Sequence, residues 1–218
     1  MKYEAVLFDL DGTVVDTLQN ITEMINHTMH HFGWEPFEPA AVKPHLGWGV
    51  DYLMRHLLPE LSDTEREEIL RYYRAYYADH STDNVCPYDG VLPMMERLKR
   101  DGFRLAIISN KPNSAVQPFA EGAFRDVISF ALGEVAGLPR KPAPDMLEYT
   151  AEKMRVSLDR CVYVGDSEVD VQTAANAGVD CISVTWGFRN REYLTKIGAT
   201  RFADTPEDLI ALLEKDTI

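Results

Sequence analysis

The sequence predicts an α/β fold, in which a Rossmann-like, doubly wound parallel sheet forms the core and a helical domain is inserted into it. Two patterns predict this fold. Short apolar runs alternate with segments of helical period along most of the chain, which is typical of βαβ units and a parallel sheet. One long interval, residues 17–83, carries helical patterns alone. The length of 218 residues suits a core domain with a small insertion.

The predicted strands of the core are short apolar runs, beginning with Ala-Val-Leu-Phe at residues 5–8. Similar runs follow at residues 104–108, 127–130, 161–164 and 181–184. Apolar residues at helical spacing predict helices at Val91–Arg100 and Asp145–Met154. Right-handed crossovers should place such helices on both faces of the sheet. We assign residues 1–16 and 84–218 to this core.

The inserted domain is expected to contain three main helices. Apolar residues recur every three or four positions from Leu18 to Phe32, and Gly33 is a plausible end for that helix. A second helix is predicted from Val50 to Leu58, before Pro59.

The third helix of the insert should begin at Ser62, because Glu65 lies three residues later and the pair fits a capping box. This helix carries a tyrosine-rich stretch, residues 72–77, which we expect to pack between helices; a ligand-stacking surface is the alternative. Residues 81–90 are rich in Asp, Asn and Pro and should return the chain to the core.

Composition excludes several classes of protein. The net charge of −13 opposes binding to nucleic acid. No apolar run is long enough to cross a membrane, and charged residues come too early for a signal peptide, so we expect a cytoplasmic location. The three cysteines are widely spaced, which argues against zinc and disulfide frameworks. No pattern specifies an oligomeric state.

Aspartates at the end of the first strand are the strongest functional signal. Asp9 and Asp11 flank Leu10 and are followed by Gly12 and Thr13. Ligands of doubly wound sheets bind at the carboxyl ends of strands. Two neighbouring carboxylates there repel each other, which is energetically unfavourable unless a cation or hydrogen bonds stabilise them. An ordinary Asp-Gly turn is the alternative for this segment alone.

Further polar segments follow other predicted strands. Ser109-Asn110-Lys111 offers a hydroxyl, an amide and backbone N–H groups for phosphoryl oxygens. Lys141 could neutralise an aspartate and a phosphate together. Asp166 follows the strand at 161–164, and Asp170 lies one helical turn later. Carboxylate oxygens suit Mg²⁺. Each segment alone has an ordinary turn, surface or helix-cap explanation, but four strand ends meeting at one edge favour a site.

These four segments match, in order and kind, those of the haloacid dehalogenase-like hydrolase superfamily, and the chain resembles its phosphoglycolate phosphatase-like branch over essentially its whole length. The resemblance implies that residues 17–83 form a mobile helical cap. It also implies that Asp9 is a nucleophile, Asp11 the acid/base and Lys141 a bridging cation. Ser109 and Asn110 would bind phosphate.

The resemblance further implies a Mg²⁺ cofactor held by Asp9, Asp166 and the backbone carbonyl of Asp11, with Asp170 and Thr13 as auxiliary residues. Its implied activity is hydrolysis of a small phosphorylated metabolite through an aspartyl phosphate, with 2-phosphoglycolate favoured. Pyrophosphate, a nucleoside monophosphate or another small sugar phosphate are the other candidate substrates.

Other functions stay open at this point. β-Phosphoglucomutase-like relatives share the four segments, but the arginine that they carry after the first cap glycine, here Gly47, is replaced by Trp48. Gly47 is a candidate substrate-binding residue or a simple hinge. A non-catalytic phospho-ligand sensor is the alternative from another class, although a sensor need not retain a nucleophile. Arg189 follows the strand at 181–184, and we expect it to face solvent; a contact to the cap or substrate at the rim of the site is the alternative.

Overall fold

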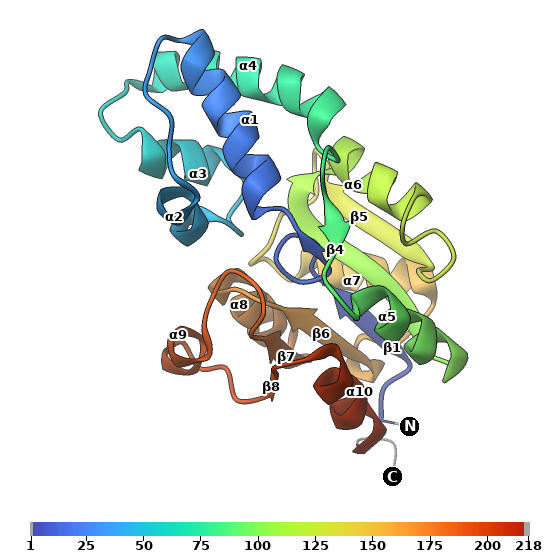
Figure 1. Cartoon of the computed structure of the whole chain (residues 1–218). Coiled ribbons are helices and arrows are strands. Elements are labelled where there is room, and N and C mark those ends of the chain that lie inside the picture. The colour runs from blue at the N-terminus through green and yellow to red at the C-terminus, as the bar shows by residue number, and fades with distance from the viewer. Residues whose placement is uncertain (1, 216–218) are drawn as a thin grey trace.

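The computed structural model describes residues 2–215 and contains a six-stranded parallel sheet with a helical unit above its carboxyl edge (Figure 1). The strand order is β5-β4-β1-β6-β7-β8, and every pairing between neighbours is parallel. The predicted fold class is confirmed. The strands are β1 (Ala5–Phe8), β4 (Arg104–Pro112), β5 (Phe130–Glu134), β6 (Cys161–Gly165), β7 (Asp180–Val184) and β8 (Phe202–Ala203).

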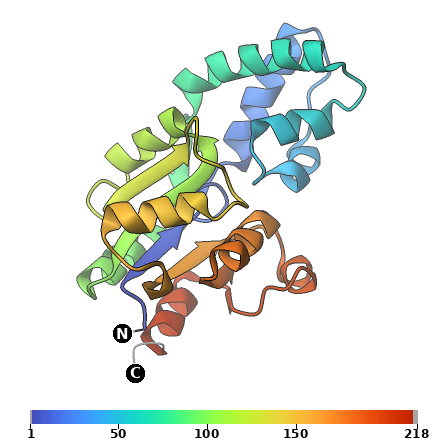
Figure 2. The ribbon, with the colours of Figure 1, turned by 180° about the vertical axis from the view of Figure 1, so that it is seen from behind.

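Helices cover both faces of the sheet, as right-handed crossovers require. Alternation along β1 places Val6 and Phe8 in one apolar layer and Ala5 and Leu7 in the other. The first layer is completed by α5 (Val91–Arg100), α6 (Asn113–Glu121) and α10 (Pro206–Lys215). The second contains α7 (Asp145–Met154) and α8 (Glu168–Ala177), which face the viewer in Figure 2. The chain also forms η2 (Leu158–Arg160) and α9 (Arg191–Lys196).

The strand predicted at residues 127–130 is misplaced, because β5 begins only at Phe130. The backbone amides of Val127 and Ile128 donate to the Phe124 carbonyl and form a turn instead. Pairing with the sheet starts when the Ser129 amide donates to the Leu105 carbonyl. Val127 is still buried in the core, so its apolar character reflects packing from a turn.

The insert is helical and consists of α1 (Leu18–His31), α2 (Pro39–Val42), η1 (Lys43–His45), α3 (Val50–Leu57) and α4 (Asp63–His80). The predicted capping box is present, since Ser62 Oγ accepts from the Glu65 amide and the Glu65 side chain accepts from the Ser62 amide. These helices share an apolar cluster that also includes Ala115 and Phe188 of the core. The division at residues 17 and 83 stays a prediction.

Two short strands, which the sequence did not indicate, join the helical unit to the core. β2 (Val15–Asp16) pairs antiparallel with β3 (Cys86–Pro87). The Tyr88 amide extends the contact by donating to the Val14 carbonyl at 3.2 Å. The two segments that connect the helical unit to the core are therefore hydrogen-bonded to each other. This pair of strands sets the direction in which the helical unit leaves the sheet.

The three cysteines are free: Cys86 is exposed, Cys161 is buried and Cys181 is half-buried. Within residues 2–215, no helix combines the length and the apolar character needed to cross a bilayer.

Candidate active site

The turn after β1 places Asp9 and Asp11 at the carboxyl edge of the sheet. Asp9 continues the parallel pairing, because its amide donates to the Val164 carbonyl at 2.8 Å. The chain then turns at Gly12, whose φ of +85° lies in the left-handed region. A Cβ at Gly12 would lie 2.5 Å from Asp166 Oδ2, so glycine is required for both the turn and the close approach of Asp166.

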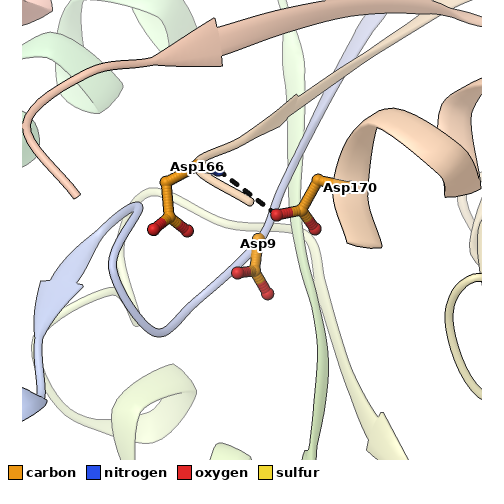
Figure 3. Close-up of side chains that lie close together, drawn as sticks. All are labelled: Asp9, Asp166 and Asp170. Atoms are coloured by element: carbon orange, nitrogen blue, oxygen red, sulfur yellow. Dashed lines mark hydrogen bonds between the residues drawn. The ribbon is translucent and has the colours of Figure 1, made fainter. Parts of the chain in front are cut away.

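Two further aspartates come from the end of β6 and from helix α8. Asp170 Oδ2 accepts hydrogen bonds from the amides of Asp166 and Ser167 at 3.2 and 3.1 Å. Ser167 Oγ donates to the same oxygen at 2.7 Å. Figure 3 shows Asp9, Asp166 and Asp170 side by side, with the Asp166 amide directed at Asp170. A Cβ at Gly165 would lie 2.3 Å from that of Asp170, so any larger residue here would force Asp170 or the strand to move.

Lys141 joins two of these carboxylates from the loop before α7. Its Nζ donates to Asp9 Oδ1 at 2.7 Å and to Asp170 Oδ1 at 2.8 Å. A third donation reaches the Tyr163 hydroxyl at 2.8 Å, and that hydroxyl donates to Asp170 at 3.0 Å. Lys141 is only 2% exposed, so its charge acts inside the site. Tyr163 belongs to an apolar run in the sequence, which gave no sign of this role.

The buried charges do not balance. Burial raises the pKa of Asp9 well above its usual range, with Lys141 opposing and the charges of Asp170 and Asp166 adding to the shift. Burial and the Asp170 carboxylate raise the pKa of Asp166 to about 7. Burial alone would raise the pKa of Asp170 too, but the Lys141 charge and hydrogen bonds from Lys141, Ser167 and Tyr163 hold it below its usual value. One lysine thus faces three carboxylates.

The carboxylate oxygens of this site are suitable ligands for a divalent cation. One carboxylate oxygen each from Asp9, Asp166 and Asp170 lies within 4.8 Å of the others. Thr13 Oγ1 and the Phe188 amide donate to the two oxygens of Asp166, at 3.1 and 2.6 Å, and fix its orientation. Buried, fixed oxygen ligands with excess negative charge suit Mg²⁺.

The second polar segment, Ser109-Asn110-Lys111, lies inside β4, because this strand continues beyond the end that the sequence predicts. Asn110 Nδ2 donates to the carbonyls of Lys141 and Gly47 at 2.9 and 3.1 Å, which links the core to the cap. Ser109 Oγ accepts from the Lys111 amide at 3.2 Å. Lys111 Nζ donates to Asp11 Oδ1 at 3.0 Å and is buried, a contact that the sequence analysis missed.

A cavity of about 520 Å³ lies between the core and the cap. Asp9, Asp11, Ser109, Asn110 and Lys111 line it from the core, and residues lining it from the cap include Gly47, Gly49, Tyr73 and Tyr77. The structure therefore brings the nucleophile and acid/base candidates, the phosphate-binding candidates and Gly47 to one cavity.

The expectation that Arg189 faces solvent is wrong, because this side chain is only 7% exposed. Its Nε and Nη2 donate to the two oxygens of Glu168 at 2.8 and 2.9 Å. Its Nη1 and Nη2 also donate at 3.0 Å to cap carbonyls, those of Lys43, Pro44 and Leu46. Trp48 Nε1 donates to Glu168 Oε1 at 2.9 Å. Arg189 and Glu168 of the core thus hold one cap loop.

Residues 6–184 match the model of the haloacid dehalogenase-like hydrolase family. The chain belongs to this family. It is 30% identical to a phosphoglycolate phosphatase of Colwellia psychrerythraea over 97% of both chains. It is 26% identical to the pyrophosphatase PpaX of Bacillus mycoides over 99% of both chains.

Among solved structures, the chain is similar to a protein from Lactobacillus delbrueckii subsp. bulgaricus that is provisionally assigned as a phosphoglycolate phosphatase. The two share 39% identity and a TM-score of 0.91, over 96% of this chain and 97% of the other. The match covers both the sheet and the helical insert, and it agrees with the resemblance found in the sequence.

Proposed function

We propose that this haloacid dehalogenase-like hydrolase is a Mg²⁺-dependent phosphatase that hydrolyses a small phosphate monoester through an aspartyl phosphate on Asp9. The observation that carries the proposal is the position of Lys141 Nζ, 2.7 Å from Asp9 and 2.8 Å from Asp170. A buried ammonium at this point favours the ionised form of the carboxylate nucleophile, against the effect of burial, and offsets its repulsion of a phosphate.

In the first step, an Asp9 oxygen attacks phosphorus and the ester P–O bond breaks. Asp11, which lines the same cavity, gives its proton to the departing alkoxide. In the second step, Asp11 takes a proton from water while the water oxygen attacks phosphorus. The bond between phosphorus and Asp9 breaks, phosphate is released, and both carboxyl groups return to their starting states. Ser109 and Asn110 would hold the phosphoryl oxygens throughout.

Asp9, Asp166 and the Asp11 backbone carbonyl would hold the Mg²⁺. The bound ion would neutralise phosphoryl charge during transfer. Asp170 is better suited to orienting Lys141 than to ligation, because donors already occupy both of its oxygens and its pKa is lowered. Thr13 would hold Asp166 in place through its hydroxyl.

We favour 2-phosphoglycolate as the substrate, because phosphoglycolate phosphatases recur among the relatives of this chain. Pyrophosphate is a second candidate, which the similarity to the pyrophosphatase PpaX supports. A cytoplasmic location and a small metabolite as the binding partner complete the proposal.

A panel of phosphate compounds tests the reaction and the substrate together. We expect phosphate release from p-nitrophenyl phosphate with Mg²⁺ and none with excess chelator. The highest kcat/KM should be found for 2-phosphoglycolate, above pyrophosphate and nucleoside monophosphates. Isomerisation of glucose 1-phosphate would instead identify a mutase, and binding of phosphate compounds without turnover would identify a sensor.

Asp9→Asn tests the covalent step. The variant should lose at least about a thousandfold in kcat, because an amide cannot displace the ester. Acid quenching during turnover of a radiolabelled monoester should leave label on the wild-type protein and none on Asp9→Asn. Asp126→Asn, at an exposed position, is the matched control. Near wild-type turnover by a clean preparation of Asp9→Asn would disprove the role of Asp9.

A further inference from the structure

Helix α4 presents two kinds of tyrosine. Tyr72 and Tyr76 stack on histidines of α1, with ring centroids 3.8 Å from His31 and 3.6 Å from His27. Tyr73 and Tyr77 lie on another face of α4, are 4% and 5% exposed, and line the cavity that contains Asp9 and Asp11. Helix packing, which the sequence predicts for residues 72–77, does not explain why Tyr73 and Tyr77 line the cavity.

The two buried phenols lack partners of their own. Tyr73 and Tyr77 stack with ring centroids 5.2 Å apart and planes 16° from parallel. No residue between 2 and 215 forms a hydrogen bond with either hydroxyl. Neither oxygen is among the fully buried polar atoms that lack a partner, so both hydroxyls are open to the cavity. Two adjacent hydroxyls that face a cavity without a protein partner are free to donate to a ligand there.

The surroundings of the pair place it next to the acid/base. Lys111 Nζ lies 5.2 Å from the centroid of the Tyr77 ring and 3.0 Å from Asp11 Oδ1. Burial raises the pKa of Tyr77 well above its usual range, and the Asp11 carboxylate adds to the shift. Burial and then Tyr77 raise the pKa of Tyr73, where Asp11 contributes less. Both phenols stay protonated and can donate.

The rest of the cap wall is mainly apolar, as at Ile21, Val50 and Leu53. Its other polar side chains are His45 and Arg74, and Arg74 Nη2 is paired with Asp51 at 2.9 Å. Two phenols beside an ammonium favour a group that only accepts hydrogen bonds, and a carboxylate is such a group. The departing alcohol must lie near Asp11, which protonates it, and therefore near this pair.

We propose that Tyr73 and Tyr77 determine substrate specificity by donating their hydroxyl hydrogens to a carboxylate on the leaving group. This inference rests on the proposed phosphatase function and deepens it. Selectivity would come from the hydrogen bonds that these hydroxyls can form with a leaving group that carries acceptor oxygens and cannot form with an apolar one. The phosphoryl end would bind in the same way for every substrate.

Two substrates of similar size test the inference. 2-Phosphoglycolate carries the carboxylate, and ethyl phosphate has a methyl group in its place. Tyr73→Phe and Tyr77→Phe remove only the hydroxyls and keep the stacked rings. For each variant, we expect the ratio of kcat/KM for 2-phosphoglycolate to that for ethyl phosphate to fall at least about tenfold. Tyr76→Phe, on the outer face of the same helix, should leave the ratio unchanged.

The remaining outcomes each decide against a specific claim. An equal loss on both substrates would show that the phenols serve packing alone, and an unchanged ratio would show that the hydroxyls do not contact the leaving group. A wild-type enzyme that prefers ethyl phosphate would overturn the inference and leave the phosphatase function standing. If the wild-type protein hydrolyses no phosphate monoester, the proposed function fails and the inference fails with it.

Discussion

Arg189 and Glu168 form a buried ion pair with two N–O contacts, of 2.8 and 2.9 Å, between the loop after β7 and the first residue of α8. The same guanidinium binds three carbonyls of the cap segment from Lys43 to Leu46. Glu168 lies two residues after Asp166, so the segment that would provide a metal ligand also contributes to the contacts with the cap. The candidate metal site and the cap are therefore linked through the contacts of Glu168 and Arg189.

Arg189→Met should destabilise the protein by about 3 to 5 kcal/mol, because Glu168 would remain buried without its partner. Urea unfolding measures this loss. The double variant Arg189→Met/Glu168→Gln should recover part of it, since the buried charge is then removed too. Arg191→Met is the matched control, because its pair with Asp204 is half exposed and should contribute less than about 1 kcal/mol. Equal effects at 189 and 191 would contradict the buried pairing.

Lys111→Met should lower kcat about ten- to a hundredfold, because Asp11 loses the group that holds its carboxylate in place. Steady-state kinetics with p-nitrophenyl phosphate give the value and avoid any effect on a carboxylate-bearing leaving group. Lys153→Met, at an exposed position on α7, should behave as wild type. A Lys111→Met enzyme with normal kcat would show that Asp11 does not depend on this contact.

Local signals in the sequence were sufficient to predict those elements whose structure depends on residues nearby in the chain. The helices at Val91–Arg100 and Asp145–Met154 have the predicted bounds, and the capping box at Ser62 and Glu65 is present. Spacing and end residues determine such features, which therefore do not require knowledge of the fold. Three of the four polar segments follow apolar runs that become strands β1, β4 and β6, whereas Lys141 lies in the loop between β5 and α7.

Features that depend on distant partners were missed. The sequence favours a solvent-facing loop arginine at position 189, with a contact to the cap as the alternative, whereas the structure pairs Arg189 with Glu168 and the cap carbonyls. Lys111 binds Asp11, which lies 100 positions earlier. Tyr163 was read as apolar although its hydroxyl contacts Lys141. In each case, the fold supplies the partner, so the residue type alone could not reveal the role.

Asp166→Asn should abolish the stabilisation that Mg²⁺ gives to the protein. The wild-type melting temperature should rise with Mg²⁺ concentration, because a ligand that binds only the folded state stabilises it. Without Mg²⁺, the variant should be at least as stable as the wild type, because one of three crowded carboxylates becomes neutral. Asp126→Asn should keep the wild-type response. A Mg²⁺-dependent shift of normal size in Asp166→Asn would exclude this carboxylate as a ligand.

Gly165→Ala tests whether Asp170 needs its close approach to the backbone. The added Cβ would lie 2.3 Å from Asp170 Cβ and Cγ, so β6 and α8 must separate. We expect a loss of about 1 to 3 kcal/mol in unfolding free energy, together with a fall in kcat as Asp170 moves away from Lys141. Gly178→Ala is the control, because its φ of +68° brings backbone strain but no atom lies within 4 Å of the new Cβ. Gly178→Ala should thus lose some stability with kcat unchanged. A Gly165→Ala enzyme with normal kcat would show that catalysis tolerates displacement of Asp170.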